Sequence, residues 1–400
     1  MKHRALFSLT CVFLAVPLFA QNLEIHYIDV EWGGAVLIIG PDGTTALLDS
    51  GETGMGTAYV APYLASVGVA AADGLDYTIV GHQHCDHVGG MDEVVAAGYD
   101  VNIANYYNGS TTTSGCVTSW NTAAAGTTAG SPVSMPVGTV INLGNGATMT
   151  CIARHGSIIG GGSISVPDEN DRSIALLIKY GAFEYLWASD LGGGSDACTG
   201  RSTGQKNIET SVIQAIVPGG ANPLIFSGGI DVLHANHHGS ESSTNPTYFN
   251  LAAPSLAVIG TGDGQSTGWD LPRINVVDDV LLGSACVSAP NALVLQTEEG
   301  NPAGSNLSTS GYCVGNIVIT TDGKSTYDVD ADGAVHQGAN EYVSSGLPWT
   351  VDLDAVDISG WKLVQANATL NYTIPNNTII PNGGYVIVGR NATKAQFETF

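Results

Sequence analysis

The stretch HQHCDHVGG, residues 82–90, places three histidines, a cysteine and an aspartate in six consecutive positions. Imidazole and carboxylate groups are common ligands of divalent metals in proteins. Core packing usually explains a single histidine, but it does not readily explain three that are joined by an aspartate. The stretch therefore predicts a metal site.

Alternation of side chains predicts how these ligands divide. Residues 76–80 form a short apolar run that is typical of a buried strand, and the stretch follows at its carboxyl end. If the chain stays extended there, His82, His84 and Asp86 share one face. Cys85 then points away into the fold, where we expect it to pack as a small apolar residue or to form a disulfide.

The end of the stretch predicts a second metal beside the first. Gly89 and Gly90 allow a tight turn into the helical spacing of residues 91–97. Because His87 lies where the chain turns, Asp86 and His87 can face a second ion.

The rest of the chain indicates an α/β sandwich. Short apolar segments bounded by turn residues alternate with segments of helical spacing through two successive halves. Residues 105–134 interrupt this pattern with an insertion rich in Gly, Ser and Thr that carries Tyr106, Tyr107 and Trp120. Such an insertion is either the rim of a substrate site or a mobile loop, and its aromatic residues either stack on a substrate or pack the loop.

Net charge excludes one class of function. The chain has 36 acidic and 12 basic residues and a net charge of −24. Such a surface repels polyanions at long range, so tight sequence-specific binding of nucleic acid is not expected. An enzyme acting on a small-molecule or nucleic-acid phosphodiester remains compatible, because bound metals reverse the local sign of charge.

The first residues have the pattern of a secretory signal. Lys2 and Arg4 precede an apolar run at residues 5–16, which predicts a signal peptide over residues 1–20. A membrane anchor is the alternative, although the run is shorter than the ~20 apolar residues of a bilayer span. No other stretch has the composition of a transmembrane segment, and the signal leads us to expect an exported protein that is secreted, periplasmic or on the cell surface.

Export also predicts disulfides. Removing the signal takes away Cys11 and leaves six of the seven cysteines in an oxidising compartment. Six cysteines leave many pairings open. Because Cys286 and Cys313 flank one short segment, that pair is the favoured one.

Further motifs follow in order along the chain. They are Asp49-Ser50-Gly51 before the stretch, His155 after a strand-like segment, Asp190 at the end of Leu186–Asp190, and His237 in the run HHGS. Together with HxHxDH at a strand end, they resemble the metallo-β-lactamase-fold hydrolases over nearly all of residues 23–330. The resemblance implies a four-layer αβ/βα sandwich for residues 21–332.

Within that superfamily the chain is similar to exported hydrolases related to the competence DNA-uptake protein of the ComEC type. The similarity lies in residues 27–35, 170–173 and 233–240. The departures from that type are Glu31 and Gly34, where Gly and Asp are usual, and Asp270-Leu271-Pro272, where a His-Pro is usual.

The resemblance implies two divalent ions, zinc or alternatively manganese, with a metal-bridging hydroxide as the nucleophile. The implied ligands are His82, His84 and His155 for one ion, Asp86, His87 and His237 for the other, and Asp190 as the bridge. Asp86 would also orient the water or accept its proton, and His238 would contact a ligand or shuttle protons. The residues expected to support these ligands from behind are Asp49, Asn170 and Ser240.

The last part of the chain resembles a different domain. After an expected linker at residues 333–340, residues 341–400 resemble a lamin tail domain, which is an immunoglobulin-like all-β sandwich. The segment is shorter than the ~100 residues that such a sandwich needs, so we expect an incomplete domain. It would tether the protein to the cell surface or to a partner, or act as a passive spacer.

The aspartate bridge favours a phosphodiester substrate. An oxygen bridge suits paired zinc or manganese ions acting on phosphate, so we expect a secreted phosphodiesterase or nuclease. Lactonases of this fold share the aspartate, and a lactonase or β-lactamase-like hydrolase of C–O or C–N bonds is therefore the alternative. A surface protein that binds metal without catalysis is a third interpretation, which the complete ligand set disfavours.

Overall fold

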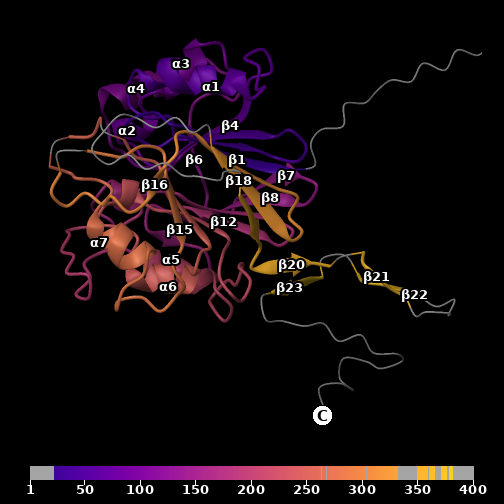
Figure 1. Cartoon of the computed structure of the whole chain (residues 1–400). Helices are drawn as coiled ribbons and strands as arrows, with labels where there is room; N and C mark the ends of the chain where they lie inside the picture. Colours follow the sequence, from indigo (N-terminus) through magenta and orange to yellow (C-terminus); the bar gives the residue numbers. More distant parts are fainter. Residues whose placement is uncertain are drawn as a thin grey trace, which may run out of the picture.

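The chain forms two mixed β-sheets that face each other, with helices on the outer face of each sheet (Figure 1). The computed structural model describes residues 22–262, 264–266, 268–301, 304–331, 349–358, 360–364, 371–375 and 378–381. The four-layer α/β sandwich expected from the sequence is present within them.

The first sheet joins early and late segments of the chain. Strand β1 pairs antiparallel with β2 and with β17, whereas β3 to β6 run parallel. Its strands in spatial order are β19 (Trp349–Asp352), β18 (Thr326–Ala331), β17 (Ile317–Thr321), β1 (Leu23–Tyr27), β2 (Val36–Ile39), β3 (Thr45–Leu48), β4 (Leu75–Val80), β5 (Val101–Tyr107) and β6 (Val133–Ser134).

The second sheet has an antiparallel half up to β12 and a parallel half from β12 to β16. Its strands in spatial order are β10 (Gly162–Ser163), β9 (Ser157–Ile158), β8 (Ala147–Arg154), β11 (Ala175–Tyr180), β12 (Phe183–Trp187), β13 (Val232–His234), β14 (Leu256–Ile259), β15 (Leu293–Gln296) and β16 (Tyr312–Cys313). Strand β7 (Val140–Gly144) pairs with β8 beside this path.

Apolar side chains on both faces of the strands hold the layers together. In β11, Leu176 and Ile178 belong to the core between the sheets, whereas Leu177 belongs to the core under the outer helices. Strand geometry sends successive side chains to opposite faces, so a strand covered on both sides needs consecutive apolar residues. Each such side chain contributes about 1.5–3 kcal/mol when it is fully buried.

Helices cover both outer faces. Over the first sheet lie η1 (Gly56–Val60), α1 (Ala61–Ser66), α2 (Cys85–Val88), α3 (Met91–Ala96) and α4 (Gly115–Ala124). Over the second sheet lie α5 (Glu209–Ile216), α6 (Pro246–Ala252), α7 (Ile274–Val276) and η4 (Val277–Leu281).

The insertion at residues 105–134 contributes to this outer layer. Helix α4 begins after Ser114, whose Oγ accepts a hydrogen bond from the Val117 backbone N–H. Trp120 of this helix is fully buried in the core that α4 shares with α1 and α3. Of the two interpretations for this aromatic residue, packing is therefore the one that the structure supports.

Two disulfides join segments far apart in the sequence. Cys85–Cys116 links α2 to α4, and Cys198 is bonded to Cys286. The favoured pair of Cys286 with Cys313 was therefore wrong. Cys313 instead lies buried in β16 at the edge of the second sheet, where spacing in the sequence gives no guidance.

The sandwich brings the carboxyl ends of several strands together. Asp49 follows β3, His82 follows β4, Asp190 follows β12 and His237 follows β13. Parallel neighbours such as β3 and β4, or β12 and β13, end at the same edge of their sheet. Ligand sites in α/β proteins form beyond such carboxyl ends, and the expected site residues gather there.

The boundary expected at residue 341 does not separate two sheets. Strand β19 pairs antiparallel with β18 and so extends the first sheet. The next residues remain attached to it, because the backbone N–H of Leu353 donates to Ser325 O and that of Asp354 donates to Asp231 Oδ1.

Beyond this point the described residues form two antiparallel pairs. Strand β20 (Ala355–Asp357) pairs with β23 (Ile379–Pro381), and β21 (Lys362–Val364) pairs with β22 (Asn371–Thr373). The lamin tail resemblance therefore stays a prediction. The expected signal peptide, the linker at 333–340, and residues 341–348 and 382–400 of the expected tail lie outside the described residues.

Over the part of the chain that the structure describes, no helix combines the length and the apolar composition that crossing a bilayer requires.

Replacing both Cys198 and Cys286 by serine is expected to lower the free energy of unfolding by about 2–4 kcal/mol. The bond closes a loop whose ends are 88 residues apart, so it restricts the unfolded chain. Urea denaturation measures the difference, and a reducing agent should destabilise the wild type at least as much. Equal stability of variant and wild type would contradict the expectation.

Unfolding free energy is expected to fall as the pH rises from about 4 to about 8 because of Asp231. Burial raises the pKa of this carboxyl group to about 8, although it accepts hydrogen bonds from the backbone N–H groups of Glu184 and Asp354. In the unfolded chain its pKa is ~3.9. Between these values the folded chain binds more protons, so rising pH favours unfolding.

Asp231→Asn cannot ionise and should flatten this dependence. The measurement is the slope of the unfolding free energy against pH, taken from denaturation curves between about pH 5 and about pH 8. Asp330→Asn, at an exposed position in β18, is the control. An unchanged slope in the Asp231 variant would refute the assignment.

Candidate metal centre

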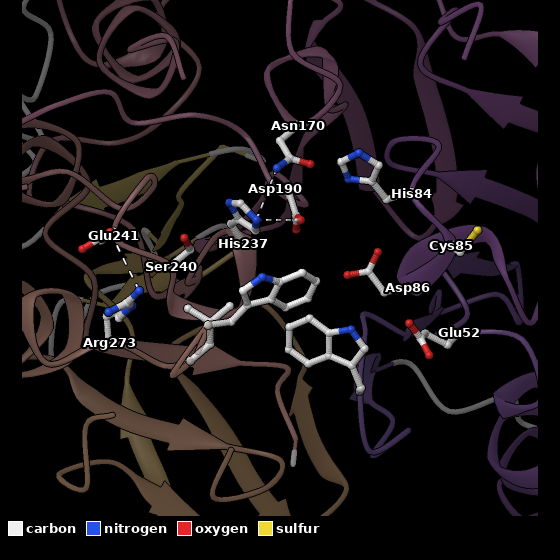
Figure 2. A pocket seen from close by; sticks show the side chains of 13 residues that line it. Glu52, His84, Cys85, Asp86, Asn170, Asp190, His237, Ser240, Glu241 and Arg273 are labelled. Carbon is white, nitrogen blue, oxygen red and sulfur yellow. Dashed lines mark hydrogen bonds and ion pairs between the residues drawn. The ribbon is translucent and has the colours of Figure 1, made fainter. Parts of the chain in front are cut away.

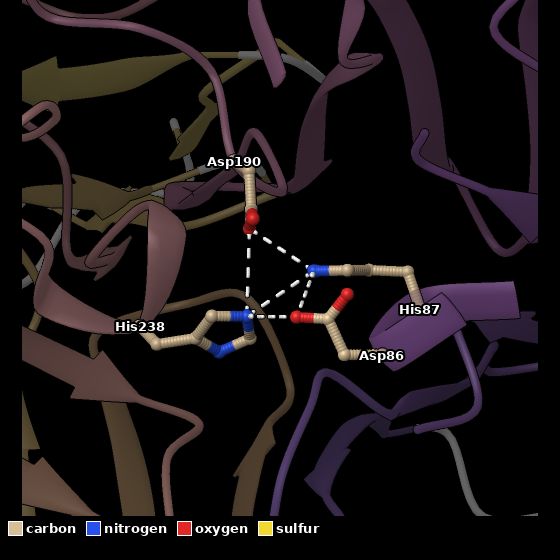
Figure 3. A group of neighbouring side chains, drawn as sticks. All are labelled: Asp86, His87, Asp190 and His238. Atoms are coloured by element: carbon tan, nitrogen blue, oxygen red, sulfur yellow. Dashed lines mark hydrogen bonds and ion pairs between the residues drawn. The ribbon is translucent and has the colours of Figure 1, made fainter. Parts of the chain in front are cut away.

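Four side chains converge where the strand ends meet. One ligating atom from each of Asp86, His87, Asp190 and His238 lies within 4.8 Å of the others (Figure 3). Nε2 of His87 is 3.2 Å from Asp190 Oδ1 and 3.2 Å from Nε2 of His238. Asp86 Oδ2 lies 3.6 Å from Nε2 of His238 and 3.8 Å from that of His87. All four are close enough to bind one cation.

Asp190 faces two groups of ligands with its two oxygens. Oδ1 lies 3.2 Å from Nε2 of His87 and 3.7 Å from Nε2 of His238. Oδ2 lies 3.6 Å from Nε2 of His82 and 3.6 Å from Nε2 of His237. The carboxylate is buried, so both oxygens are held in place. This is the geometry that a bridging ligand requires.

The second group consists of three imidazoles and an amide. His82 Nε2 lies 3.0 Å from Nδ1 of His84, and His237 Nε2 lies 3.3 Å from Nδ2 of Asn170. Figure 2 shows His84, Asn170 and His237 around Asp190. The chain therefore brings a second set of nitrogen and oxygen donors to the other oxygen of Asp190.

Hydrogen bonds behind the rings orient the first group. Nδ1 of His87 lies 2.8 Å from Asp49 Oδ2, and Nδ1 of His238 lies 2.7 Å from Gly260 O. A carbonyl oxygen and an ionised carboxylate can only accept, so His238 donates Nδ1–H to Gly260 O, and His87 donates Nδ1–H to Asp49 when that group is ionised. Nε2 of each neutral ring is then an acceptor that faces the carboxylates, as in carboxylate–histidine–metal arrangements. Asp49 therefore lies where the sequence predicted a supporting residue.

Hydroxyl groups support the second group. Nδ1 of His237 lies 2.7 Å from Ser242 Oγ, and Nδ1 of His82 lies 3.2 Å from Ser189 Oγ. Ser240 lies one step further away, with its Oγ 3.0 Å from that of Ser242. Sequence reasoning selected Ser240 and missed Ser242 and Ser189, because serines carry no pattern that marks a hydrogen bond to a histidine.

Several centre residues have left-handed backbones. Asp49, Ser189, His237 and His238 have φ values of 57°, 48°, 54° and 53°. Non-glycine residues in this region cost about 1–3 kcal/mol each and persist where the surroundings enforce them. Such strain concentrated at one cluster is typical of a functional site.

The adjacent histidines take positions that are exchanged relative to the sequence expectation. Of the two, His238 joins Asp86 and His87, whereas His237 faces Asn170 and the other oxygen of Asp190. Because both residues have left-handed backbones, their rings point towards different oxygens of Asp190. The order of the motifs along the sequence does not determine these backbone angles.

His155 lies apart from the groups. Its backbone N–H donates to Arg172 O, and it has φ 50° in the turn after β8. Burial, followed by the nearby charges of Arg172 and Arg154, lowers the pKa of its imidazole. This hydrogen bond and the charged groups near His155 involve none of the other expected ligands. Asn170, rather than His155, lies beside His237.

Cys85 points in a different direction from the one expected. Cys85 is the first residue of helix α2, and His84 caps that helix. The extended backbone, in which alternate side chains share a face, therefore ends at His84. The side chain is exposed at the pocket and is bonded to Cys116. The inward orientation was therefore wrong, and the disulfide alternative is the one that the structure contains.

Opposing charges hold the protonation states of the centre. Burial raises the pKa of the Asp190 carboxyl group, but the neighbouring imidazoles, His87 foremost, outweigh burial and hold that pKa well below its usual range. Burial likewise lowers the pKa of His87, and nearby carboxylates, Asp190 foremost, raise it well above its usual range. The buried carboxylates are therefore stabilised by positive charge between them, either as a protonated imidazole or as a bound metal ion.

A pocket of about 530 Å³ opens over the centre (Figure 2). It is lined by Trp32, Glu52, His84, Cys85, Asp86, Asn170, Asp190, His237, Ser240, Glu241, Trp269, Leu271 and Arg273. Because Asp86 and Asp190 belong to both the centre and the pocket wall, a substrate entering the pocket reaches the ligands directly.

The donor set fits divalent cations. Asp190 Oδ1 and Asn170 Oδ1 are buried and accept no hydrogen bond from the described residues. Nε2 of His87 and Nε2 of His238 face each other at 3.2 Å, and both are acceptors whenever the two rings are neutral. Buried acceptors without a donor are costly, and a bound cation satisfies them together. Nitrogen and oxygen donors without a thiolate suit zinc or manganese.

Comparisons with known proteins show distant structural similarity. No protein-family model matches the sequence, and no curated protein matches it. The metallo-β-lactamase-fold protein YhfI from Bacillus subtilis is 13% identical, with a TM-score of 0.36 over 59% of this chain and 85% of that one. CmlA, a diiron β-hydroxylase from Streptomyces venezuelae, is 14% identical, with a TM-score of 0.34 over 67% of this chain and 48% of that one. At these values the likenesses do not establish a family.

Removing the His238 imidazole is expected to weaken metal binding. His238→Ala takes a candidate ligand from the group of Asp86, His87 and Asp190, so zinc content after dialysis should fall below that of the wild type. His155→Ala is the matched control and should keep the wild-type content, because His155 lies outside both groups. Elemental analysis of the dialysed proteins measures the content. Loss of zinc from the His155 variant alone would reverse the assignment.

Proposed function

We propose that this chain is an exported phosphodiesterase with nuclease-type chemistry, built on a metallo-β-lactamase-type fold of the ComEC kind. The observation that carries the proposal is the Asp190 carboxylate, which presents one oxygen to each of two ligand groups. A carboxylate in this position is suited to two divalent ions, zinc or manganese, held side by side.

The proposed ligands follow the two groups. They are His82, His84, His237 and Asn170 Oδ1 for one ion, Asp86, His87 and His238 for the other, and Asp190 for both. When bound, such ions lower the pKa of a coordinated water towards ~7 and offset negative charge on an attacked phosphoryl group.

Asp86 is the residue best placed to handle the proton of the attacking water. It lies on the boundary between the centre and the pocket, and 15% of its side chain is exposed. Burial raises the pKa of its carboxyl group, but His87 and His238 outweigh burial and hold that pKa below its usual range. Asp86 is therefore ionised and able to orient a water by accepting a hydrogen bond.

The chemistry of the donors supports phosphate over acyl substrates. Both groups consist of imidazole nitrogens and hard oxygens, and the nearby sulfur of Cys85 is committed to a disulfide. Paired sites of nitrogen and hard oxygen donors suit hydrolysis of phosphate esters. Arg273 also lines the pocket, where its guanidinium can pair with an oxyanion.

Export and tethering complete the proposal. Two disulfides are typical of a protein that matures in an oxidising compartment, as the expected signal peptide implies. The expected lamin tail segment would attach the enzyme to the cell surface or to a partner.

A lactonase or β-lactamase-like hydrolase is the second candidate. The pocket wall contains the apolar side chains Trp32, Trp269 and Leu271 and one guanidinium. A small cyclic ester or amide that carries a carboxylate would also suit such a wall.

Four substrates separate the two candidates. The protein loaded with zinc or manganese should hydrolyse bis-p-nitrophenyl phosphate and single-stranded DNA, and should leave a simple lactone and nitrocefin largely intact. Hydrolysis of the lactone or nitrocefin without any phosphodiester cleavage would reject the phosphodiesterase.

Variants test the residues that carry the reaction. Asp86→Ala and His84→Ala should each lower kcat on bis-p-nitrophenyl phosphate by about 100-fold or more, which is the usual effect of losing a general base or a metal ligand. His155→Ala, outside both groups, should retain turnover. Activity that survives in both Asp86→Ala and His84→Ala would show that the site is misassigned.

A further inference from the structure

Two indole rings lead outward from the centre along one wall of the pocket. The Trp32 ring lies 4.6 Å, centroid to centroid, from the imidazole of His238, and the Trp269 ring lies 5.4 Å from that of Trp32. Trp32 is buried, whereas 47% of Trp269 is exposed. The outer indole therefore presents a flat apolar surface in the pocket, close to the metal ligands.

Two hydrogen bonds join residues on either side of Trp269. The Gln265 side chain accepts from the Leu271 backbone N–H and donates to Leu271 O, both at 2.8 Å. A Cβ added at Gly264 would lie 3.1 Å from Cβ of Trp32, so the loop backbone packs against that residue. A rigid aromatic surface binds a flat ring at low entropic cost. A single exposed tryptophan on a protein surface is common and implies no binding site. Trp269, however, lines the pocket together with Arg273.

Arg273 is the one basic side chain among the residues that line the pocket, where four carboxylates also lie. Its Nε is buried and has no hydrogen-bond partner among the described residues. Its ion pair with Glu241 is long, at 3.9 Å, and Glu241 also accepts from Nδ2 of Asn275 at 3.4 Å. In Figure 2, Arg273 and Glu241 lie across the pocket from Asp86 and His84. The guanidinium is thus only weakly paired by the described residues, and its outer N–H groups can pair with a bound anion.

We propose that this wall is a subsite for the group attached to the scissile phosphate, namely a nucleoside whose other hydroxyl carries a second phosphate. The inference rests on the proposed phosphodiesterase function. The nucleobase lies against Trp269, and the second phosphate pairs with Arg273 while the first phosphate reaches the metal centre. Stacking on an aromatic side chain and pairing with Arg are the usual means of holding such units.

The charges around the subsite limit the length of substrate. One guanidinium, partly neutralised by Glu241, can hold one additional phosphate, and the chain's net charge of −24 repels longer polyanions. The preferred substrate is therefore a short fragment with one phosphate beyond the scissile bond.

The experiment compares two chromogenic esters that differ only in that phosphate. They are thymidine 5′-(p-nitrophenyl phosphate) with a free 3′-hydroxyl and the same ester with a 3′-phosphate. Thymidine 3′-(p-nitrophenyl phosphate), with and without a 5′-phosphate, tests the opposite orientation of the nucleoside between the two phosphates. The quantity measured is the ratio of kcat/KM with the second phosphate to kcat/KM without it. General damage to the enzyme cancels in this ratio.

In at least one polarity, the wild-type ratio should be about 10–100, which is the usual effect of a charge-assisted contact. Arg273→Gln should bring the ratio to about 1, and Glu241→Gln should raise it because the guanidinium is released. Trp269→Ala should raise KM for the thymidine esters about 5- to 100-fold relative to methyl p-nitrophenyl phosphate. Lys324→Gln removes an exposed cation away from the pocket and should leave the ratio unchanged.

Calorimetric titration with thymidine 3′,5′-bisphosphate separates this inference from the proposed function. Binding that weakens about 10-fold or more in Arg273→Gln and in Trp269→Ala, without hydrolysis of any phosphodiester, would retain the subsite and reject the phosphodiesterase. Hydrolysis with wild-type ratios near 1 in both polarities would reject the subsite and retain the phosphodiesterase. Binding of the bisphosphate that is equal in wild type and both variants would also reject the subsite.

Discussion

A buried carboxylate, that of Asp190, is the constraint on which the centre depends. It lies between His82 and His237 on one side and His87 and His238 on the other, and it cannot be solvated there. A buried anion is stable only beside cations or donors. The Nδ1 atoms of the rings are held by Asp49, Gly260, Ser189 and Ser242 so that the Nε2 atoms face inward. The arrangement therefore has its lowest free energy when cations occupy the middle.

The sandwich supplies this constraint through its topology. Ligands come from loops after β4 in one sheet and after β12 and β13 in the other, so the centre exists only when the two sheets face each other correctly. The core between the sheets fixes that relation with fully buried side chains such as Trp187 and Tyr27. Left-handed backbones at the strand ends add local strain that this packing has to sustain. Stability of the core and geometry of the centre are thus coupled.

The features that could be predicted from the sequence are those that depend on a local residue pattern. Alternation and turn residues predicted the layered fold, and the density of ligands in residues 82–87 predicted the location of the centre. Prediction from the sequence failed where one residue's conformation decides the direction of a side chain. Left-handed backbones at His237 and His238 exchange two rings, and a helix that begins at Cys85 turns that side chain outward. His155 was selected from order along the chain, but only folding shows that Asn170 reaches His237 instead.

The pocket extends the same electrostatic argument to the substrate. Asp86, Glu52 and Glu241 add negative charge around a centre that already contains Asp190, so anions have few places to bind without metal ions. Under the proposed function, local positive charge would come from bound ions at one end of the pocket and from Arg273 at the other. A molecule with two anionic groups joined by a flat apolar unit would match these two positions and the exposed indole ring of Trp269 in the same pocket. An acidic protein would in this way recognise an anionic substrate, because two localised cationic points act at short range while the overall charge acts at long range.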